Sequence, residues 1–275
     1  MRVLITGAAG QLGNDLIALF KGEEIHATDV RELDVTDRSA VDKKVEAVKP
    51  DWIINAAAYN NVDAAETNED LALAINARAP RYIADAARRS GAALVHISTD
   101  YVFDGRKGSP YVEDDVPNPL GAYGRSKYEG EKQVLQSGAA AVVLRTAWLY
   151  GKHGPPSFVK AILAAADRQK ELRVVADQVG SPTSSADLAT AIQQAMVGRA
   201  RGLFHVTNSG VCSRFEFAQA IVAGRVPVVP ITTAEMPRPA ARPAYSALRS
   251  IRWEQAGFAP LRPWREALDE YLATP

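Results

Sequence analysis

The chain has 275 residues, and its 32 basic and 32 acidic side chains cancel to a formal net charge of zero at pH 7. This balance excludes a general electrostatic attraction to nucleic acid or to a membrane surface, so we expect neither as a partner. The single cysteine, Cys212, excludes an internal disulfide, the four scattered histidines argue against a metal site, and no apolar run approaches the ~20 residues of a spanning helix. We therefore expect a soluble, cytoplasmic protein without a catalytic metal.

Short β-rich runs alternate with helical patterns in the first part of the chain. We predict strands at residues 2–6, 24–28, 52–55, 94–98, 141–145 and 172–175. Helices are expected between them, near residues 12–20, 39–48, 67–89, 121–136 and 157–169. The strand runs are almost continuously apolar, which is typical of strands buried on both faces. A β-α-β alternation of this kind predicts an α/β fold with a Rossmann-like, doubly wound parallel sheet.

The strict alternation loosens after about residue 150, which suggests a smaller second domain. Residues 1–150 are expected to form the sheet domain and residues 151–275 mainly the second one, with room for later segments to return to the first. Ser213 and Glu216 have the spacing of a capping box, and further helices are expected at about 185–197 and 264–272. Prolines and arginines between 225 and 243 predict an irregular segment, either a solvated loop or a loop that covers a substrate.

Three glycines spaced three apart follow the first predicted strand. Gly7 can take the tight turn, Gly10 lets a phosphate approach the backbone, and Gly13 lets the next helix pack closely on the sheet. Gln11 and Leu12 open that helix, whose free N–H groups attract anions. The arrangement predicts a site for the pyrophosphate of a dinucleotide, with an ordinary strand-to-helix turn as the alternative.

Further cofactor contacts are expected at the ends of the second and third strands. Asp29 lies about 20 residues after the turn, where a carboxylate can accept from the adenine ribose, as in NAD enzymes. Arg31 could instead meet the additional phosphate of NADP. Asp34 and Val35 could contact the adenine, although Asp34 could also serve only as a turn residue. Small side chains after the third strand would let the dinucleotide lie across the strand ends: Ala56, Ala57 and Ala58.

Two Tyr-x-x-x-Lys pairs occur in one predicted helix, and they cannot both face a bound cofactor. Tyr123 and Lys127 lie on one helical face, whereas Tyr128 and Lys132 are turned about 140° away. We assign the chemistry to Tyr123 and Lys127, since Tyr123 opens the helix directly after a loop, and we place the second pair on the helix surface. A nearby ammonium group favours the phenolate, so we expect Tyr123 to ionise more easily and to act as a general acid.

The fourth strand ends in hydroxyl and carboxyl groups. The carboxyl ends of parallel strands line the binding crevice, so a hydroxyl there can reach a bound carbonyl. Thr99 is our candidate donor to the substrate oxygen, and Ser98 is the second choice. Asp100 could contact a sugar hydroxyl or orient its neighbours.

These features resemble the extended short-chain dehydrogenase/reductase superfamily and, within it, the dTDP-4-dehydrorhamnose reductase family. Beyond the glycine turn and Tyr-x-x-x-Lys, the resemblance rests on Ser-Thr-Asp-Tyr-Val-Phe-Asp-Gly at 98–105 and Leu-Arg-Thr-Ala-Trp-Leu-Tyr at 144–150. It continues with Asp-Gln-Val-Gly-Ser-Pro-Thr at 177–183 and Arg-Pro-x-x-Ser-x-Leu at 242–248, and thus covers nearly the whole chain.

The resemblance implies reduction of the C4 keto group of dTDP-4-dehydro-L-rhamnose by NADPH or NADH, giving dTDP-L-rhamnose. Tyr123 would protonate the sugar oxygen, Lys127 would support the tyrosine and the nicotinamide ribose, and Thr99 would polarise the carbonyl. Trp148 would lie against the sugar ring, and an arginine of the late loop would neutralise the diphosphate. The residues expected to bind substrate are Thr99, Val102, Phe103, Tyr123, Trp148 and Arg242.

Two departures from the family pattern bear on the substrate. Pro-Pro-Ser-Phe at 155–158 stands where members often have Asn-Asn-Phe, and Arg249 follows Leu248 where an acidic residue is usual. A reductase or epimerase acting on another nucleotide sugar therefore stays open. A dehydratase resembling this group would need an acidic residue at position 101 to remove a proton from the sugar, and Tyr101 argues against that activity. A non-catalytic NADP-binding subunit, similar to the regulatory subunit of methionine adenosyltransferase, is the alternative from another class, and a homodimer is compatible with all of these.

Overall fold

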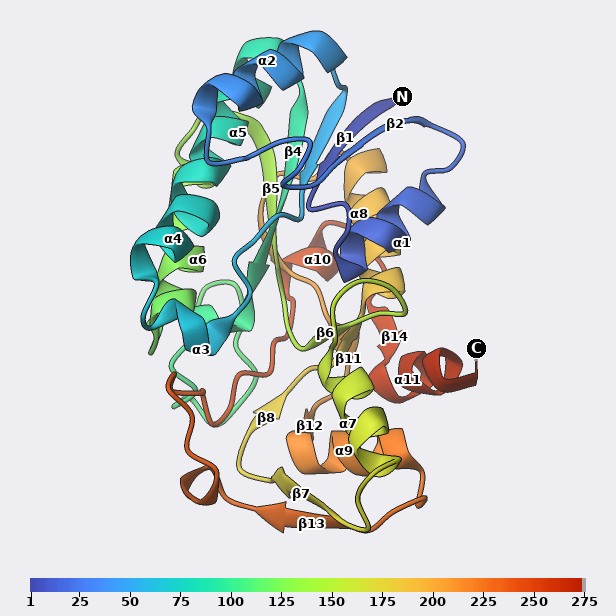
Figure 1. Cartoon of the computed structure of the whole chain (residues 1–275). Helices are drawn as coiled ribbons and strands as arrows, with labels where there is room; N and C mark the ends of the chain where they lie inside the picture. The colour runs from blue at the N-terminus through green and yellow to red at the C-terminus, as the bar shows by residue number, and fades with distance from the viewer. Residues whose placement is uncertain (274–275) are drawn as a thin grey trace.

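The computed structural model describes residues 1–273, and its centre is a six-stranded, all-parallel sheet (Figure 1). The strand order is β10-β5-β4-β3-β1-β2. The strands are β1 (Arg2–Thr6), β2 (Glu24–Thr28), β3 (Trp52–Asn55), β4 (Ala93–Thr99), β5 (Ala140–Thr146) and β10 (Gly202–His205). Because β2 and β3 flank β1 on opposite sides, the chain reverses its direction of winding at β1 and β3. The carboxyl ends of these strands form the crevice in which such sheets bind ligands.

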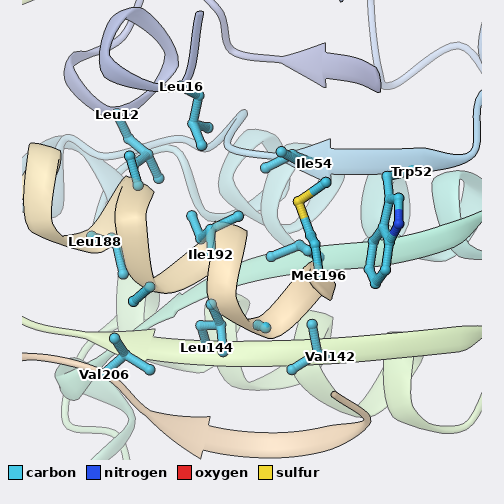
Figure 2. Close-up of a cluster of buried hydrophobic side chains, with 14 of the residues drawn as sticks. Leu12, Leu16, Trp52, Ile54, Val142, Leu144, Leu188, Ile192, Met196 and Val206 are labelled. Atoms are coloured by element: carbon cyan, nitrogen blue, oxygen red, sulfur yellow. The ribbon is translucent and has the colours of Figure 1, made fainter. Parts of the chain in front are cut away.

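Helices cover both faces of the sheet. One face packs against α1 (Gln11–Leu19) and α8 (Ser185–Val197), and the other against α2 (Arg38–Val48), α5 (Ala79–Ser90) and α6 (Ala122–Leu135). Figure 2 shows the first layer, in which Leu12 and Leu16 of α1 and Ile192 of α8 meet Ile54 and Leu144 of the sheet. Burial of both faces explains why the strands are apolar throughout, and the predicted doubly wound fold is confirmed.

A smaller region at the lower end of Figure 1 packs around Phe217. Its helices are α7 (Phe158–Ala166), α9 (Arg214–Val222) and α11 (Trp264–Ala273). Four two-stranded ladders accompany them: β7 (Leu172–Val175) with β13 (Val228–Ile231), β8 (Val179–Gly180) with β12 (Cys212–Ser213), β6 (Leu149–Tyr150) with β9 (Thr183–Ser184), and β11 (Asn208–Ser209) with β14 (Leu261–Pro263). The predicted capping box is present, since Ser213 and Glu216 bond each other's backbone N–H groups.

The structure differs from the predictions for the strand at 172–175, the irregular segment at 225–243 and the helix at 67–89. The strand at 172–175 exists, but it pairs with β13 in the smaller region, and the sixth place in the main sheet belongs to β10, which we did not predict. Strand β13 also lies inside the segment predicted to be irregular. Helix α8 packs on the main sheet and β10 pairs with β5, although both follow residue 150.

The single helix predicted at 67–89 is divided. It consists of α4 (Glu69–Leu73), a π-helical turn η1 (Ala74–Arg78) and α5. The buried amide of Asn76 in this turn accepts from the backbone N–H of Tyr59 at 2.8 Å and donates to the Tyr59 carbonyl at 3.1 Å and to the hydroxyl of Ser126 at 3.0 Å. The turn therefore ties the loop after β3 to α6.

Short elements complete the chain. These are α3 (Val62–Ala65), the 3-10 turns η2 (Asp100–Val102) and η3 (Thr233–Glu235), and α10 (Arg252–Gln255). Over the described residues, no helix has the length and apolar character needed to cross a membrane.

Candidate active site

A cavity of about 630 Å³ lies at the carboxyl ends of the central strands, between the sheet and the smaller region. The sheet side contributes the glycine turn, the loop after β3, the end of β4 and the start of α6. The smaller region contributes Pro155, Pro156, Phe158 and Arg214. The predicted site residues that line it are Gly7, Gly10, Gln11, Leu12, Gly13, Ala56, Ala58, Thr99, Asp100, Tyr123, Lys127 and Trp148.

The glycine turn fits the pyrophosphate of a dinucleotide. Gly7 has a φ of +70°, and a Cβ there would lie 2.6 Å from the backbone nitrogen of Ala57. A Cβ on Gly13 would lie 2.5 Å from the carbonyl oxygens of Gly7 and Ala8, so this position also requires glycine. Gly10 caps α1 without a side-chain hydrogen bond, which leaves N–H groups at the start of α1 available to an anion. A bound nicotinamide cofactor would supply the hydride.

The predicted adenine-side residues lie outside the cavity lining. The carboxylate of Asp29 accepts from the Ala9 N–H at 3.0 Å, beside the glycine turn, and Arg31 is exposed two residues later. Asp34 accepts from the N–H and the hydroxyl of Thr36 and thus forms a turn. Val35 and Ala57 pack with the core on the α2 side of the sheet. Cofactor contacts of these side chains stay predictions.

Close backbone packing brings the start of α6 to the end of β4. A Cβ on Gly124 would lie only 2.2 Å from the carbonyl oxygen of Tyr101, so a glycine is needed where α6 crosses the η2 turn. The rings of Tyr101 and Tyr123 meet edge to face, with 5.7 Å between their centroids. The hydroxyl of Thr99 interacts with the Tyr123 phenol. The proton donor and the hydroxyl that we expected to act together therefore lie side by side.

The protonation of the Tyr-x-x-x-Lys pair differs from our expectation. Burial raises the pKa of Tyr123, and the Thr99 hydroxyl opposes this shift only in part. Burial also lowers the pKa of Lys127 to about 8, while its ammonium group donates to the Ile97 carbonyl at 2.6 Å. The prediction of easier ionisation was thus wrong, because burial is the largest influence on the pKa of Tyr123 and Lys127 is not among the groups that lower it. Tyr123 is held in the protonated form, which is the form that donates a proton.

The other polar groups at the end of β4 already have partners. Asp100 accepts from Ser246 at 2.5 Å and from Thr99 at 3.1 Å, and burial raises its pKa to about 6. The Ser98 hydroxyl donates to Glu131 at 2.5 Å. The Thr99 hydroxyl also donates to a carboxylate, but its bond to Asp100 is the longer of the two, at 3.1 Å against 2.5 Å, so Ser98 is the poorer candidate for a contact to a substrate oxygen.

The second tyrosine–lysine pair lies away from the cavity lining. Lys132 is exposed and pairs with Glu129, as expected for the helix surface. Tyr128 is partly buried beside the cluster formed by Val102 and its neighbours.

Val102 and Phe103 were wrongly predicted to contact substrate. Both side chains are fully buried, and Phe103 stacks on Tyr111 with 4.1 Å between the ring centroids. Arg242 also lies outside the cavity lining, because it pairs with Asp63 at 3.0 Å and donates to the Ala240 carbonyl at 2.9 Å.

Sequence reasoning missed several residues of the cavity wall. Tyr101 and Arg214 both line it, as do Asn60, Asn61 and Val62 from the loop after β3. The capping box predicted where α9 begins and thus the place of Arg214 in a helix. No sequence signal showed that this helix start faces the end of β4, since that contact joins residues more than a hundred positions apart.

A glycine turn after the first strand of a doubly wound sheet and a Tyr-x-x-x-Lys helix on the same cavity define a short-chain dehydrogenase/reductase. The chain is accordingly an NAD(P)-dependent oxidoreductase. It belongs, more narrowly, to the family described as the RmlD substrate binding domain, which matches residues 1–275.

Known proteins resemble the chain over its full length. It is 44% identical to dTDP-4-dehydrorhamnose reductase of Mycobacterium tuberculosis, over 100% of this chain and 93% of that protein. It is 46% identical to a probable dTDP-4,6-dihydroxy-2-methyloxan-3-one 4-ketoreductase of Streptomyces antibioticus, over 98% of this chain and 94% of that protein. The structure of dTDP-4-dehydrorhamnose reductase from Bacillus anthracis in complex with NADP superposes with a TM-score of 0.96, at 41% identity, over 100% of this chain and 99% of that one.

Proposed function

We propose that this reductase converts the C4 keto group of dTDP-4-dehydro-L-rhamnose to the alcohol of dTDP-L-rhamnose, with NADPH or NADH as the reductant. The observation that carries the proposal is the contact between the Tyr123 phenol and the Thr99 hydroxyl in a cavity that also contains the glycine turn. Two neighbouring hydroxyl groups can both donate to one carbonyl oxygen.

The residues then divide the work as follows. Tyr123 donates its proton to the carbonyl oxygen, because its raised pKa keeps the phenol protonated at neutral pH. Thr99 donates a hydrogen bond to the same oxygen and stabilises the negative charge that develops there. Lys127 stays cationic below pH 8 and stabilises the phenolate that Tyr123 becomes after donation. Trp148 and Tyr101 line the wall beside the sugar.

Reduced-cofactor oxidation with dTDP-4-dehydrorhamnose tests the proposal. Tyr123→Phe should lower kcat by about 10²- to 10⁴-fold, the range for loss of a general acid, and should still bind cofactor. Tyr128→Phe is the matched control on the same helix and should keep its rate. Unchanged turnover in Tyr123→Phe would remove Tyr123 as the proton donor.

The same assay separates the alternative functions. Turnover only with another 4-keto nucleotide sugar, such as the substrate named for the Streptomyces antibioticus relative, would keep the reductase and change its substrate. Tightly held NAD with epimerisation would favour an epimerase. Cofactor binding without turnover of any keto sugar would favour a non-catalytic subunit. The cytoplasmic location and a homodimer stay predictions.

Cofactor choice has its own test. The Bacillus anthracis relative was solved with NADP, and Arg31 of this chain is exposed two residues after Asp29. If Arg31 meets the additional phosphate of NADPH, Arg31→Gln should weaken NADPH binding about 10-fold and leave NADH binding unchanged. Equal affinities of the variant and the wild type for NADPH would contradict this role.

A further inference from the structure

Arg214, which none of our sequence arguments assigned to the site, lies between two aromatic rings of the cavity wall. Its guanidinium carbon lies 3.6 Å from the centroid of Trp148 and 4.7 Å from that of Phe158. At 3.6 Å the guanidinium group covers one face of the indole. A Cβ on Gly180 would lie 2.4 Å from Cε2 of the same ring, so the indole is tightly held there as well. The Trp148 face covered by Arg214 is therefore not free to stack on a sugar.

The charge of Arg214 has no close carboxylate partner. Within residues 1–273, no carboxylate oxygen lies within the 4 Å of an ion pair from its guanidinium nitrogens. Asp100 is near enough to act on it electrostatically, but the oxygens of Asp100 accept from Ser246 and Thr99. Burial lowers the pKa of Arg214, which shows that the guanidinium lacks part of the solvation it has in water.

Arg214 is a partly buried cation in a cavity wall with no carboxylate partner, and such a group is suited to an anion. Of the described residues that line the cavity, Arg214 is the single arginine. The other nearby arginine, Arg242, already has Asp63 and the Ala240 carbonyl as partners.

The position of Arg214 relative to the reacting groups indicates which anion it meets. The Tyr101 side chain interacts with Arg214 and also contacts Tyr123 edge to face, so one aromatic ring separates the proton donor from the guanidinium group. In a hexopyranose, C4 and C1 lie at opposite ends of the ring. When the C4 carbonyl is at Tyr123, the group on C1 extends about one ring further along the wall.

We propose that Arg214 binds the diphosphate attached to C1 of the nucleotide-sugar substrate, in place of the arginine of the 225–243 segment that we had expected. This inference rests on the proposed function, because it takes the reacting carbonyl to lie at Tyr123.

Binding of dTDP and of thymidine, measured by titration calorimetry with NADPH present, tests the role without turnover. The wild type should bind dTDP more tightly than thymidine, and only the affinity for dTDP should fall with added salt. Arg214→Gln should weaken dTDP binding about 10- to 100-fold, as for loss of charge-assisted hydrogen bonds, and should leave thymidine and NADPH binding unchanged. Arg214→Lys should lie between the two, because it keeps the charge and loses the planar fork.

Arg225→Gln is the matched control, since this arginine follows α9 on the exposed surface and pairs with Asp167 at 3.7 Å. It should leave all three affinities unchanged. Equal dTDP affinity in Arg214→Gln and the wild type would overturn the inference, and so would an equal loss of thymidine or NADPH binding. If Arg214→Gln does not fold, the lysine variant and the salt dependence of the wild type decide the question. Normal dTDP binding without turnover of keto sugars would contradict the proposed function alone.

Discussion

The buried ion pair between α6 and β5 gives a stability prediction that can be worked out from the structure. Glu131 of α6 accepts two hydrogen bonds from Arg145 of β5, at 2.8 and 2.6 Å, and the side chains are 1% and 2% exposed. Glu131 also accepts from Ser98 at the end of β4. Glu131→Gln keeps the shape of the side chain and removes the negative charge, which leaves the Arg145 cation buried without compensation.

Breaking such a pair costs about 3–5 kcal/mol of folding free energy, because the remaining ion has been removed from water. For a chain of this size, 1 kcal/mol corresponds to about 2 °C in Tm, so Glu131→Gln should melt about 6–10 °C below the wild type. Glu129→Gln is the control from the same helix. Glu129 pairs with Lys132, but these side chains are 36% and 42% exposed, so its loss should cost less than about 1 kcal/mol.

Urea denaturation of both variants, with Tm measured in parallel, checks the difference. The reasoning depends on burial rather than on the number of ion pairs. A loss below about 1 kcal/mol in Glu131→Gln, or equal losses in the two variants, would refute it. Since Ser98 precedes Thr99, we also expect kcat to fall in Glu131→Gln and to be unchanged in Glu129→Gln.

Three further predictions concern the site itself. The ammonium charge of Lys127 is lost as pH rises through its pKa of about 8, so kcat should fall above pH 8, and Lys127→Met should be slow at every pH; a flat pH–rate profile of the wild type would contradict this. Burial raises the pKa of Asp100 to about 6, so its contribution to stability is present below pH 4 and lost as pH rises to 6. Urea denaturation between pH 4 and pH 6 should show that Asp100→Asn loses less unfolding free energy with rising pH than the wild type. Parallel pH dependences of the two proteins would count against this assignment. Gly180→Ala would place a Cβ 2.4 Å from Cε2 of Trp148 and should raise KM for the sugar nucleotide about 10-fold, whereas Gly22→Ala, with nothing within 4 Å, should not; steady-state kinetics at saturating NADPH compare the two.

The sequence predicted those elements whose signals are local. The helix expected at 121–136 is α6 (Ala122–Leu135), and the strand expected at 141–145 lies within β5 (Ala140–Thr146). Periodicity and apolar runs are enough for such elements. The π-helical turn at 74–78 was missed because it depends on Asn76, whose partners Tyr59 and Ser126 lie 17 and 50 residues away. Strand β10 (Gly202–His205) was missed because its two apolar residues lie between a glycine and a histidine and form no apolar run like those of the other strands.

The site residues, too, could be predicted where their signals are local and not where they depend on contacts between distant parts of the chain. Tyr123, Lys127 and Thr99 were found because strand ends and helix starts have a known direction in a parallel sheet, and all three line the cavity. The pKa of Tyr123 was predicted in the wrong direction because a sequence shows the spacing to a lysine but not the depth of burial. Arg242 was chosen because a loop rich in arginine suggests free cations, and its pairing with Asp63 is visible only in three dimensions.

On the proposed function, proton donation belongs to one side of the cavity and much of the sugar binding to the other. Tyr123, Thr99 and the glycine turn belong to the sheet domain, whereas Phe158 and Arg214 come from the smaller region, beside Trp148. Substitutions in the smaller region can therefore change the sugar that is bound without disturbing proton donation. Relatives at 44% and 46% identity carry names for different keto sugars, as this separation would allow. The loop after β3 and the start of α3 are the exception, because Asn60, Asn61 and Val62 line the cavity from the sheet domain. If Arg214 binds the diphosphate, these three residues remain free to distinguish sugars as well.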